Sequence, residues 1–214
     1  MEEPTSADVD RRMDALLAEA EAYFMGQGGV HDAAAEIGRR LGEAGIDYAI
    51  AGALALGEHG FRRLTTDVDV LITREGLARF KTEWLGRGYV EKFPGSRGLR
   101  DTEFGVRIEF LVSGEFPGDG KPKPVAFPEP EVAFVEVAGA RVVGLAKLVE
   151  LKLISGGTPG RRKDLGDVQE LIKRLRLTAA FEGRLHPSVR ENYRALWAEA
   201  QDRPPSGCDS ARKI

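Results

Sequence analysis

The alternation of apolar and polar residues predicts the strands at the centre of this chain. Residues 67–73 read DVDVLIT, so the two valines and the isoleucine share one face of a strand, while Asp67 and Asp69 share the other. Residues 106–112 alternate in the same way and place Glu109 on the face opposite their apolar positions. We expect these two strands to be neighbours in one sheet, with their three carboxylates close together.

Apolar residues that recur every three or four positions predict helices before, between and after the strands. The expected helices cover residues 6–24, 32–44, 54–59, 74–88, 145–155, 162–175, 178–183 and 188–201. Further strands are expected near residues 46–50, 89–91, 99–103, 132–137 and 141–143. The expected fold class is therefore α+β.

The same pattern divides the chain into four parts. Residues 1–45 form two helices that we expect to pack on the core, residues 46–144 form the core itself, and residues 145–201 form a C-terminal helical part. Residues 202–214 are polar and are expected to be a disordered tail. Residues 113–130 are rich in Gly, Pro and Lys and predict a long loop, which either borders the acceptor side of a cleft or is only an extended connector.

The two aspartates need a positive partner. Carboxylates side by side on one face repel each other unless a cation lies between them, and Mg²⁺ prefers such hard oxygen ligands. Upstream, the strand near residues 46–50 ends in the small residues Gly52 and Ala53, directly before a helix. Small residues let a phosphate approach the backbone N–H groups at a helix start. This layout could hold a metal-bound triphosphate.

These residues also form a longer motif, which resembles the signature of the polymerase-beta-like nucleotidyltransferases and is most similar to the small bacterial ones, including those of toxin–antitoxin systems. The matching positions are Gly52-Ala53, Ala55-Leu56, His59-Gly60, Arg63, Thr65 and Asp67-Val68-Asp69. Ala53 departs from the motif, because the family usually has Gly or Ser there. A hydroxyl contact to phosphate would be lost at this position, while the backbone contact could remain.

The resemblance implies a nucleotidyltransferase fold, which is a mixed sheet of about five or more strands with flanking and C-terminal helices. It implies an Mg²⁺-dependent transfer of a nucleoside monophosphate, with AMP favoured, from a nucleoside triphosphate to a hydroxyl acceptor. Two Mg²⁺ ions are expected. The implied catalytic residues and metal ligands are Asp67, Asp69 and Glu109. The implied nucleotide-binding residues are Gly52, Ala53, Arg63 and Thr65.

Two charged residues interrupt the apolar faces of the C-terminal helices. Lys152 lies in the middle of the apolar arc of residues 145–155, and Asp164 lies within the apolar face of residues 162–175. A buried lysine requires an anion, because an unpaired buried charge is costly. Either Lys152 and Asp164 pair to lock the two helices together, or Lys152 reaches the triphosphate and is oriented by Asp164 or by Asp167, which lies at the border of the same face. Both can hold at once.

Several simpler interpretations stay open. Asp67 and Asp69 could be solvated acids at the start of a strand, Glu109 could pair with Arg107 on a solvent face, and Arg63 could be a surface residue. A competing function class is a non-catalytic module with this fold that binds a nucleotide or a partner. Possible acceptors are a protein hydroxyl, a tRNA end or a small molecule such as an aminoglycoside, in a toxin–antitoxin or resistance context.

Composition narrows the remaining classes. The net charge of −3, from 31 basic and 34 acidic residues, argues against a surface that coats nucleic acid, but it leaves room for a local basic groove. The single cysteine, Cys208, excludes an internal disulfide framework. The first residues lack an apolar signal-peptide segment, and no apolar run approaches the roughly 18 residues that span a bilayer. We therefore expect a cytoplasmic protein with no membrane partner.

Overall fold

The computed structural model describes residues 6–137 and 139–202. Residues 203–214, including Cys208, lie outside the described part, and so does almost all of the tail that was expected to be disordered. The chain forms two compact units. The first unit contains residues 1–115 and 127–144, and the second contains residues 116–126 and 145–214.

The first unit is built on a seven-stranded mixed sheet with the strand order β3-β4-β5-β2-β1-β7-β6. In chain order the strands are β1 (Tyr48–Ile50), β2 (Asp67–Ile72), β3 (Tyr89–Glu91), β4 (Leu99–Asp101), β5 (Arg107–Val112), β6 (Phe134–Val137) and β7 (Ala140–Val143). The pairs β2–β5 and β1–β7 are parallel, and the other four pairs are antiparallel. The expected mixed sheet with flanking helices is confirmed.

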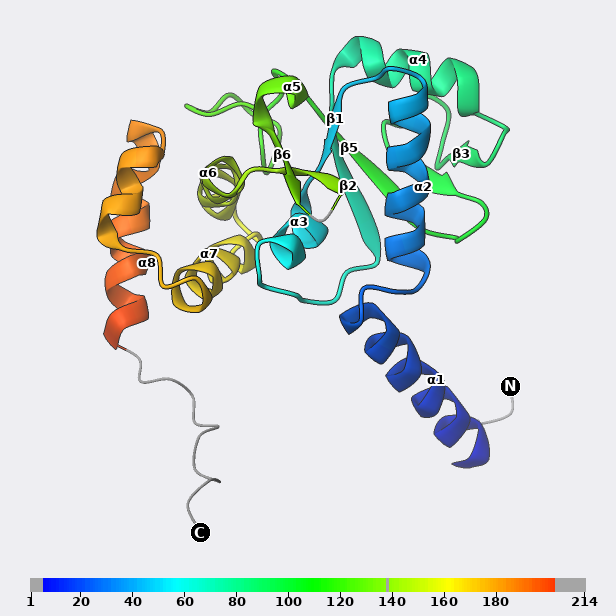
Figure 1. Ribbon diagram of the computed structural model, residues 1–214, viewed down its shortest axis with the longest axis horizontal. Helices are drawn as coiled ribbons and strands as arrows, with labels where there is room; N and C mark the ends of the chain where they lie inside the picture. The colour runs from blue at the N-terminus through cyan, green and yellow to red at the C-terminus, as the bar shows by residue number, and fades with distance from the viewer. Residues whose placement is uncertain (1–5, 138, 203–214) are drawn as a thin grey trace. The chain divides into compact units, whose positions relative to one another are not determined.

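The first unit also contains helices, most of which contact the sheet, whereas the N-terminal one extends away from it (Figure 1). They are α1 (Ser6–Phe24), α2 (Gly29–Glu43), α3 (Gly52–Glu58), α4 (Arg74–Trp84) and the short α5 (Pro130–Ala133). On the apolar face of the sheet, the ring of Phe80 from α4 packs against Phe110 with centroids 5.9 Å apart and against Tyr89 at 5.1 Å. Val68, Val70 and Ile108 are fully buried on the same face. Burial of this face fixes which face of β2 and β5 carries the acids.

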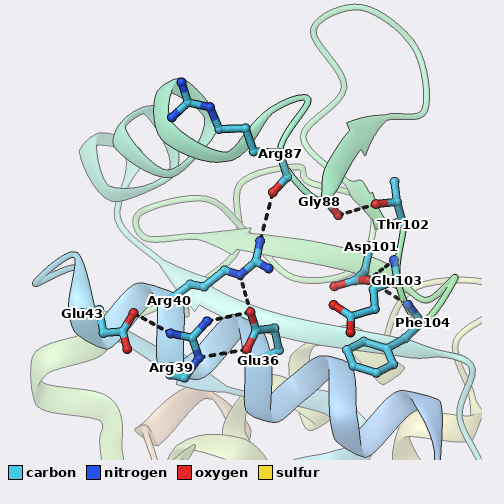
Figure 2. A network of polar contacts seen from close by, with 10 residues as sticks. All are labelled: Glu36, Arg39, Arg40, Glu43, Arg87, Gly88, Asp101, Thr102, Glu103 and Phe104. Carbon is cyan, nitrogen blue, oxygen red and sulfur yellow. Dashed lines mark hydrogen bonds and ion pairs between the residues drawn. The ribbon is translucent and has the colours of Figure 1, made fainter.

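An arginine of α2 ties that helix to the β3 end of the sheet. Figure 2 shows the Arg40 guanidinium bonded to the Glu36 carboxylate and to the backbone carbonyl of Arg87. The same guanidinium lies 4.4 Å from the ring centroid of Trp84 and 5.1 Å from that of Tyr89. Paired with a carboxylate and stacked on two rings, Arg40 is held by contacts that lysine could not reproduce.

Two expectations about the first unit were wrong in detail. The apolar stripe of α1 is not buried, since Met13, Leu16 and Leu17 are each more than half exposed. The strand expected over residues 132–137 begins only at Phe134. Pro130 occupies the first turn of α5, where its fixed φ favours a helix start, and so one helical turn precedes the strand.

The second unit is helical. It contains α6 (Leu145–Gly156), α7 (Lys163–Arg174), two 3₁₀ helices, η1 (Ala179–Arg184) and η2 (Pro187–Val189), and α8 (Arg190–Asp202). Buried Tyr193 of α8 donates its hydroxyl to the Thr178 carbonyl at 3.0 Å, and Trp197 donates to the Leu177 carbonyl at 2.8 Å. In the part of the chain that the structure describes, no helix combines the length and the apolar character needed to cross a membrane.

Candidate functional site

The register of two parallel strands brings the predicted acids together. Asp69 of β2 pairs with Glu109 of β5, and Asp67 pairs with Arg107. Paired residues on neighbouring strands point to the same face, and adjacent strands lie about 4.8 Å apart. The three carboxylates therefore share one face of the sheet over two neighbouring strands, as expected, and Arg107 lies beside them.

The turn between β1 and α3 packs directly against Asp69. The Ala51 N–H donates to the Asp69 backbone carbonyl at 2.8 Å, which continues the β1–β2 pairing to the start of the turn. Gly52 has φ +58, a conformation that favours glycine. A Cβ at this position would overlap Asp69 Oδ2 and lie 2.7 Å from its Cγ. Only glycine fits here, so the small-residue turn and the acid form one local structure.

The Asp67 carboxylate is oriented by its neighbours. The Thr65 hydroxyl donates to Asp67 Oδ1, and Arg107 Nη2 lies 3.9 Å from Asp67 Oδ2. Thr65 thus acts on the acid itself, which makes it a positioning residue in this arrangement. Behind the same segment, the Tyr23 hydroxyl of α1 donates to the Arg63 backbone carbonyl at 2.8 Å. Burial raises the pKa of Tyr23, so its hydroxyl stays a donor.

Glu109 is exposed and borders a second glycine. A Cβ on Gly98, the residue before β4, would lie 3.0 Å from Glu109 Oε2 and 3.3 Å from its Cδ. Within the described residues Glu109 makes no ion pair, and Arg107 turns to Asp67 instead. The simpler interpretation, a Glu109–Arg107 pair, is therefore not what the structure contains.

The donor set suits a hard cation in residue type and backbone position. Its three side chains point to different neighbours, however: Asp67 to Thr65, Asp69 to Gly52, and Glu109 to Gly98. Among residues 6–137 and 139–202, no three His, Cys, Asp or Glu side chains are arranged to hold a metal ion.

Three further positions of the motif are Ala53, Arg63 and His59. Ala53 is buried in the first turn of α3, and Arg63 is half-buried in the segment before β2. His59, at the end of α3, contacts the Val143 backbone carbonyl through Nε2 at 2.8 Å. This contact ties His59 to the end of β7, and we assign His59 no chemistry.

Lys152 and Asp164 meet in the second unit. Lys152 Nζ lies 3.1 Å from Asp164 Oδ1 and 2.7 Å from Asp167 Oδ2, and all three side chains are buried. Ser155 Oγ donates to Asp164 Oδ2 at 2.8 Å, and Arg161 Nε lies 3.0 Å from the same oxygen. The predicted ion pair between the two helices is present, with Asp167 as a further member.

Burial alone would raise the pKa of Asp164, but Lys152, Ser155 and Arg161 outweigh it and lower the pKa below its ordinary value. The acid is thus ionised in the folded protein.

Sequence reasoning missed one buried acid in the same unit. Glu150 of α6 accepts a hydrogen bond from the His186 backbone N–H at 2.6 Å and pairs with Lys147. The available signal was the apolar character of α6 on nearly all sides, which leaves little exposed surface for any charged residue in it. Glu150 stabilises the approach of η2 to α6 and has no apparent chemistry of its own.

Comparisons with known proteins give matches among solved structures only, since no family model and no curated protein sequence matches the chain. A proposed nucleotidyltransferase from Thermotoga maritima matches with 17% identity over 64% of this chain and 88% of its own, at a TM-score of 0.44. The antibiotic-resistance factor ANT(2'')-Ia matches with 16% identity over 76% of this chain and 92% of its own, at 0.47.

An antigenic nucleotidyltransferase-like protein from Paracoccidioides brasiliensis matches with 15% identity over 81% of this chain and 88% of its own, at a TM-score of 0.46. At such identities and TM-scores, these likenesses say nothing about the substrate of this chain.

Proposed function

We propose that this protein transfers a nucleoside monophosphate, with AMP favoured, from a nucleoside triphosphate to a hydroxyl acceptor. The observation that carries the proposal is the pairing of Asp69 with Glu109, with Asp67 on the same face and the Gly52 turn against Asp69. A solvated strand start would not explain why a third acid, forty residues away, lies beside the first two.

Asp67, Asp69 and Glu109 would hold Mg²⁺, with two ions expected, and the metal would neutralise charge on the triphosphate. The acceptor hydroxyl attacks the α-phosphorus in line, and pyrophosphate leaves. Glu109, as the exposed carboxylate on the side away from the Gly52 turn, accepts the hydroxyl proton. Thr65 holds Asp67 in place, so much of the contribution of the protein is positioning.

The nucleotide-binding role is assigned first to Gly52 and Ala53, which begin α3, because the backbone N–H groups of a helix start favour a phosphate. Arg63 is a candidate for a phosphate contact. The predicted role of Lys152 and Asp164 in triphosphate binding is also a proposal. Both charges are already accounted for by the ion pair between α6 and α7.

Calorimetric titration with ATP, with and without Mg²⁺, tests the site directly. We expect Mg²⁺-dependent binding in the wild type and its loss in Asp69→Asn and Asp67→Asn, with the fold kept. The matched control is Asp47→Asn, which removes an exposed carboxylate of the same unit that lies 3.8 Å from Arg141. Equal ATP binding in Asp69→Asn and the wild type would exclude the proposed site.

The competing function is a non-catalytic nucleotide-binding module. Incubation with labelled nucleoside triphosphates, Mg²⁺ and a host lysate separates the two, because only an enzyme leaves label on a protein, an RNA or a small molecule. The identity of the labelled product also shows which class of acceptor is used. ATP binding without any labelled product would favour the module.

A further inference from the structure

Two arginines oppose each other beside the acids. Arg100 of β4 pairs directly with Arg107 of β5, and both are exposed. Because Arg107 also pairs with Asp67, the face that bears the acids carries the two guanidinium groups as well. Like charges in directly opposed positions destabilise a sheet. An anion bound between the two guanidinium groups would reduce this repulsion.

The acidic side chains of the protein compensate only part of the charge of the two arginines. Arg107 lies 3.9 Å from Asp67 and 3.4 Å from the Thr66 hydroxyl. Within the described residues Arg100 makes no ion pair and no side-chain hydrogen bond. One of the two charges is therefore left for solvent or for a ligand.

The β4–β5 turn holds this register firmly. The Asp101 N–H donates to the Val106 carbonyl at 2.8 Å, and the Asp101 carboxylate accepts the backbone N–H groups of Glu103 and Phe104 at 2.8 and 3.0 Å (Figure 2). Arg100 Nη2 would lie 3.6 Å from a Cβ on Gly105, so its guanidinium rests along the turn. The two arginines are thus presented by a rigid hairpin.

Arg100 and the Gly52 turn lie on opposite sides of the two strands that carry the carboxylates. The strand order β4-β5-β2-β1 places the turn at the end of β1 and Arg100 on β4, three strands away, or about 14 Å at ~4.8 Å per strand. If the triphosphate binds at the turn, a second anion at Arg100 belongs to the other substrate. Glu109 lies on the strand between the donor side and Arg100.

We propose that Arg100 and Arg107 bind a phosphate group of the acceptor, such as the phosphate that a nucleotide carries either free or at the end of an RNA strand. The inference rests on the proposed function and names its acceptor class. The acceptor hydroxyl forms a new bond to the α-phosphorus, the bond to pyrophosphate breaks, and the proton passes to Glu109.

Binding of a fluorescent ten-nucleotide RNA, with free AMP as competitor, tests this without catalysis. We expect Arg100→Gln to weaken RNA binding roughly tenfold and to lower the slope of log K against log salt by about 1. Arg87→Gln is the matched control, because its side chain is exposed and points away from the network in Figure 2. Arg100→Lys should restore part of the binding.

The outcomes are distinct. Competition by AMP identifies a free nucleotide as a sufficient acceptor, whereas RNA binding that AMP does not displace identifies a strand end; both support the arginine site. RNA and AMP that fail to bind the wild type, or bind Arg100→Gln equally well, would overturn it. Mg²⁺-dependent ATP binding should be equal in the wild type and Arg100→Gln, so a failure of the donor site is seen separately through Asp69→Asn.

Discussion

Asp69 and Glu109 occupy directly paired positions on the parallel strands β2 and β5. The connection between these strands contains α4, β3 and β4, as a parallel pair requires a crossover. A slip of one residue in this register would move Glu109 to the apolar face, where Ile108 and Phe110 are buried. The core that fixes the strands therefore also fixes the carboxylates.

Gly52→Ala should weaken nucleotide binding by displacing either the backbone of the turn or the Asp69 carboxylate. Gly52 has φ +58, and an added Cβ would overlap Asp69 Oδ2, so either the turn or the carboxylate must move. We expect Mg²⁺-dependent ATP binding to fall at least tenfold and the free energy of unfolding to fall by about 1–3 kcal/mol. Calorimetry and urea unfolding measure the two effects. Gly57→Ala in the same helix is the control, because its Cβ would meet only the Arg62 side chain at 3.4 Å; unchanged ATP binding in Gly52→Ala would contradict the proposed role of the turn.

Much of this fold could be predicted from local patterns. Alternation along β5 and over residues 67–70 of β2 correctly assigned the apolar and acid-bearing faces, because a half-buried strand buries every second residue. Leu71 is an exception, because it is fully buried on the acid-bearing face. The ion pair between Lys152 and Asp164 could be predicted as well, because a charge within an apolar helix face requires a counterion nearby.

Other features depend on partners that no local pattern names. Nothing in residues 99–112 indicates that Arg100 opposes Arg107, because the register is set by the turn and its Asp101 hydrogen bonds. The orientation of the acids is a further case, as Thr65 and Gly98 come from segments without strong periodicity. The prediction that α1 packs on the core was wrong for a related reason. A helical pattern predicts an apolar face, but it does not indicate which part of the protein covers that face.

Lys152→Met should unfold the second unit selectively. The variant leaves Asp164 and Asp167 buried without the lysine that bonds to both, and breaking a buried pair from one side costs about 3–5 kcal/mol. Urea unfolding in a Trp84→Phe background measures this, because Trp197 is then the sole tryptophan and belongs to the second unit. Lys163→Met, which removes an exposed lysine of α7, should leave the transition unchanged; equal stability of the two variants would argue against the ion cluster.

Gly88→Ala should loosen the attachment of α2. Gly88 has φ +105, and its Cβ would lie 2.8 Å from Arg40 Nη1, so the guanidinium would leave the Arg87 carbonyl. Gly86→Ala is the matched variant, since φ is +75 and no atom lies within 4 Å of its Cβ. Both should lower the free energy of unfolding through backbone strain, and Gly88→Ala should lose about 1 kcal/mol more. Identical urea midpoints for the two would show that the Arg40 contact adds nothing.

The lowered pKa of Asp164 predicts acid sensitivity in the second unit. Burial opposes the shift, but Lys152, Ser155 and Arg161 favour the ionised carboxylate in the folded state, whereas the unfolded chain titrates near the ordinary value of 3.8. Below about pH 5 the unfolded state therefore binds more protons, so stability declines as pH falls through 3.8 and toward the lower folded pKa. Urea midpoints read from Trp197 between pH 7 and pH 3 should show this decline in the wild type and a shallower one in Asp164→Asn. The exposed control Glu191→Gln should keep the wild-type slope, and an equally steep decline in Asp164→Asn would assign the acid sensitivity to other groups.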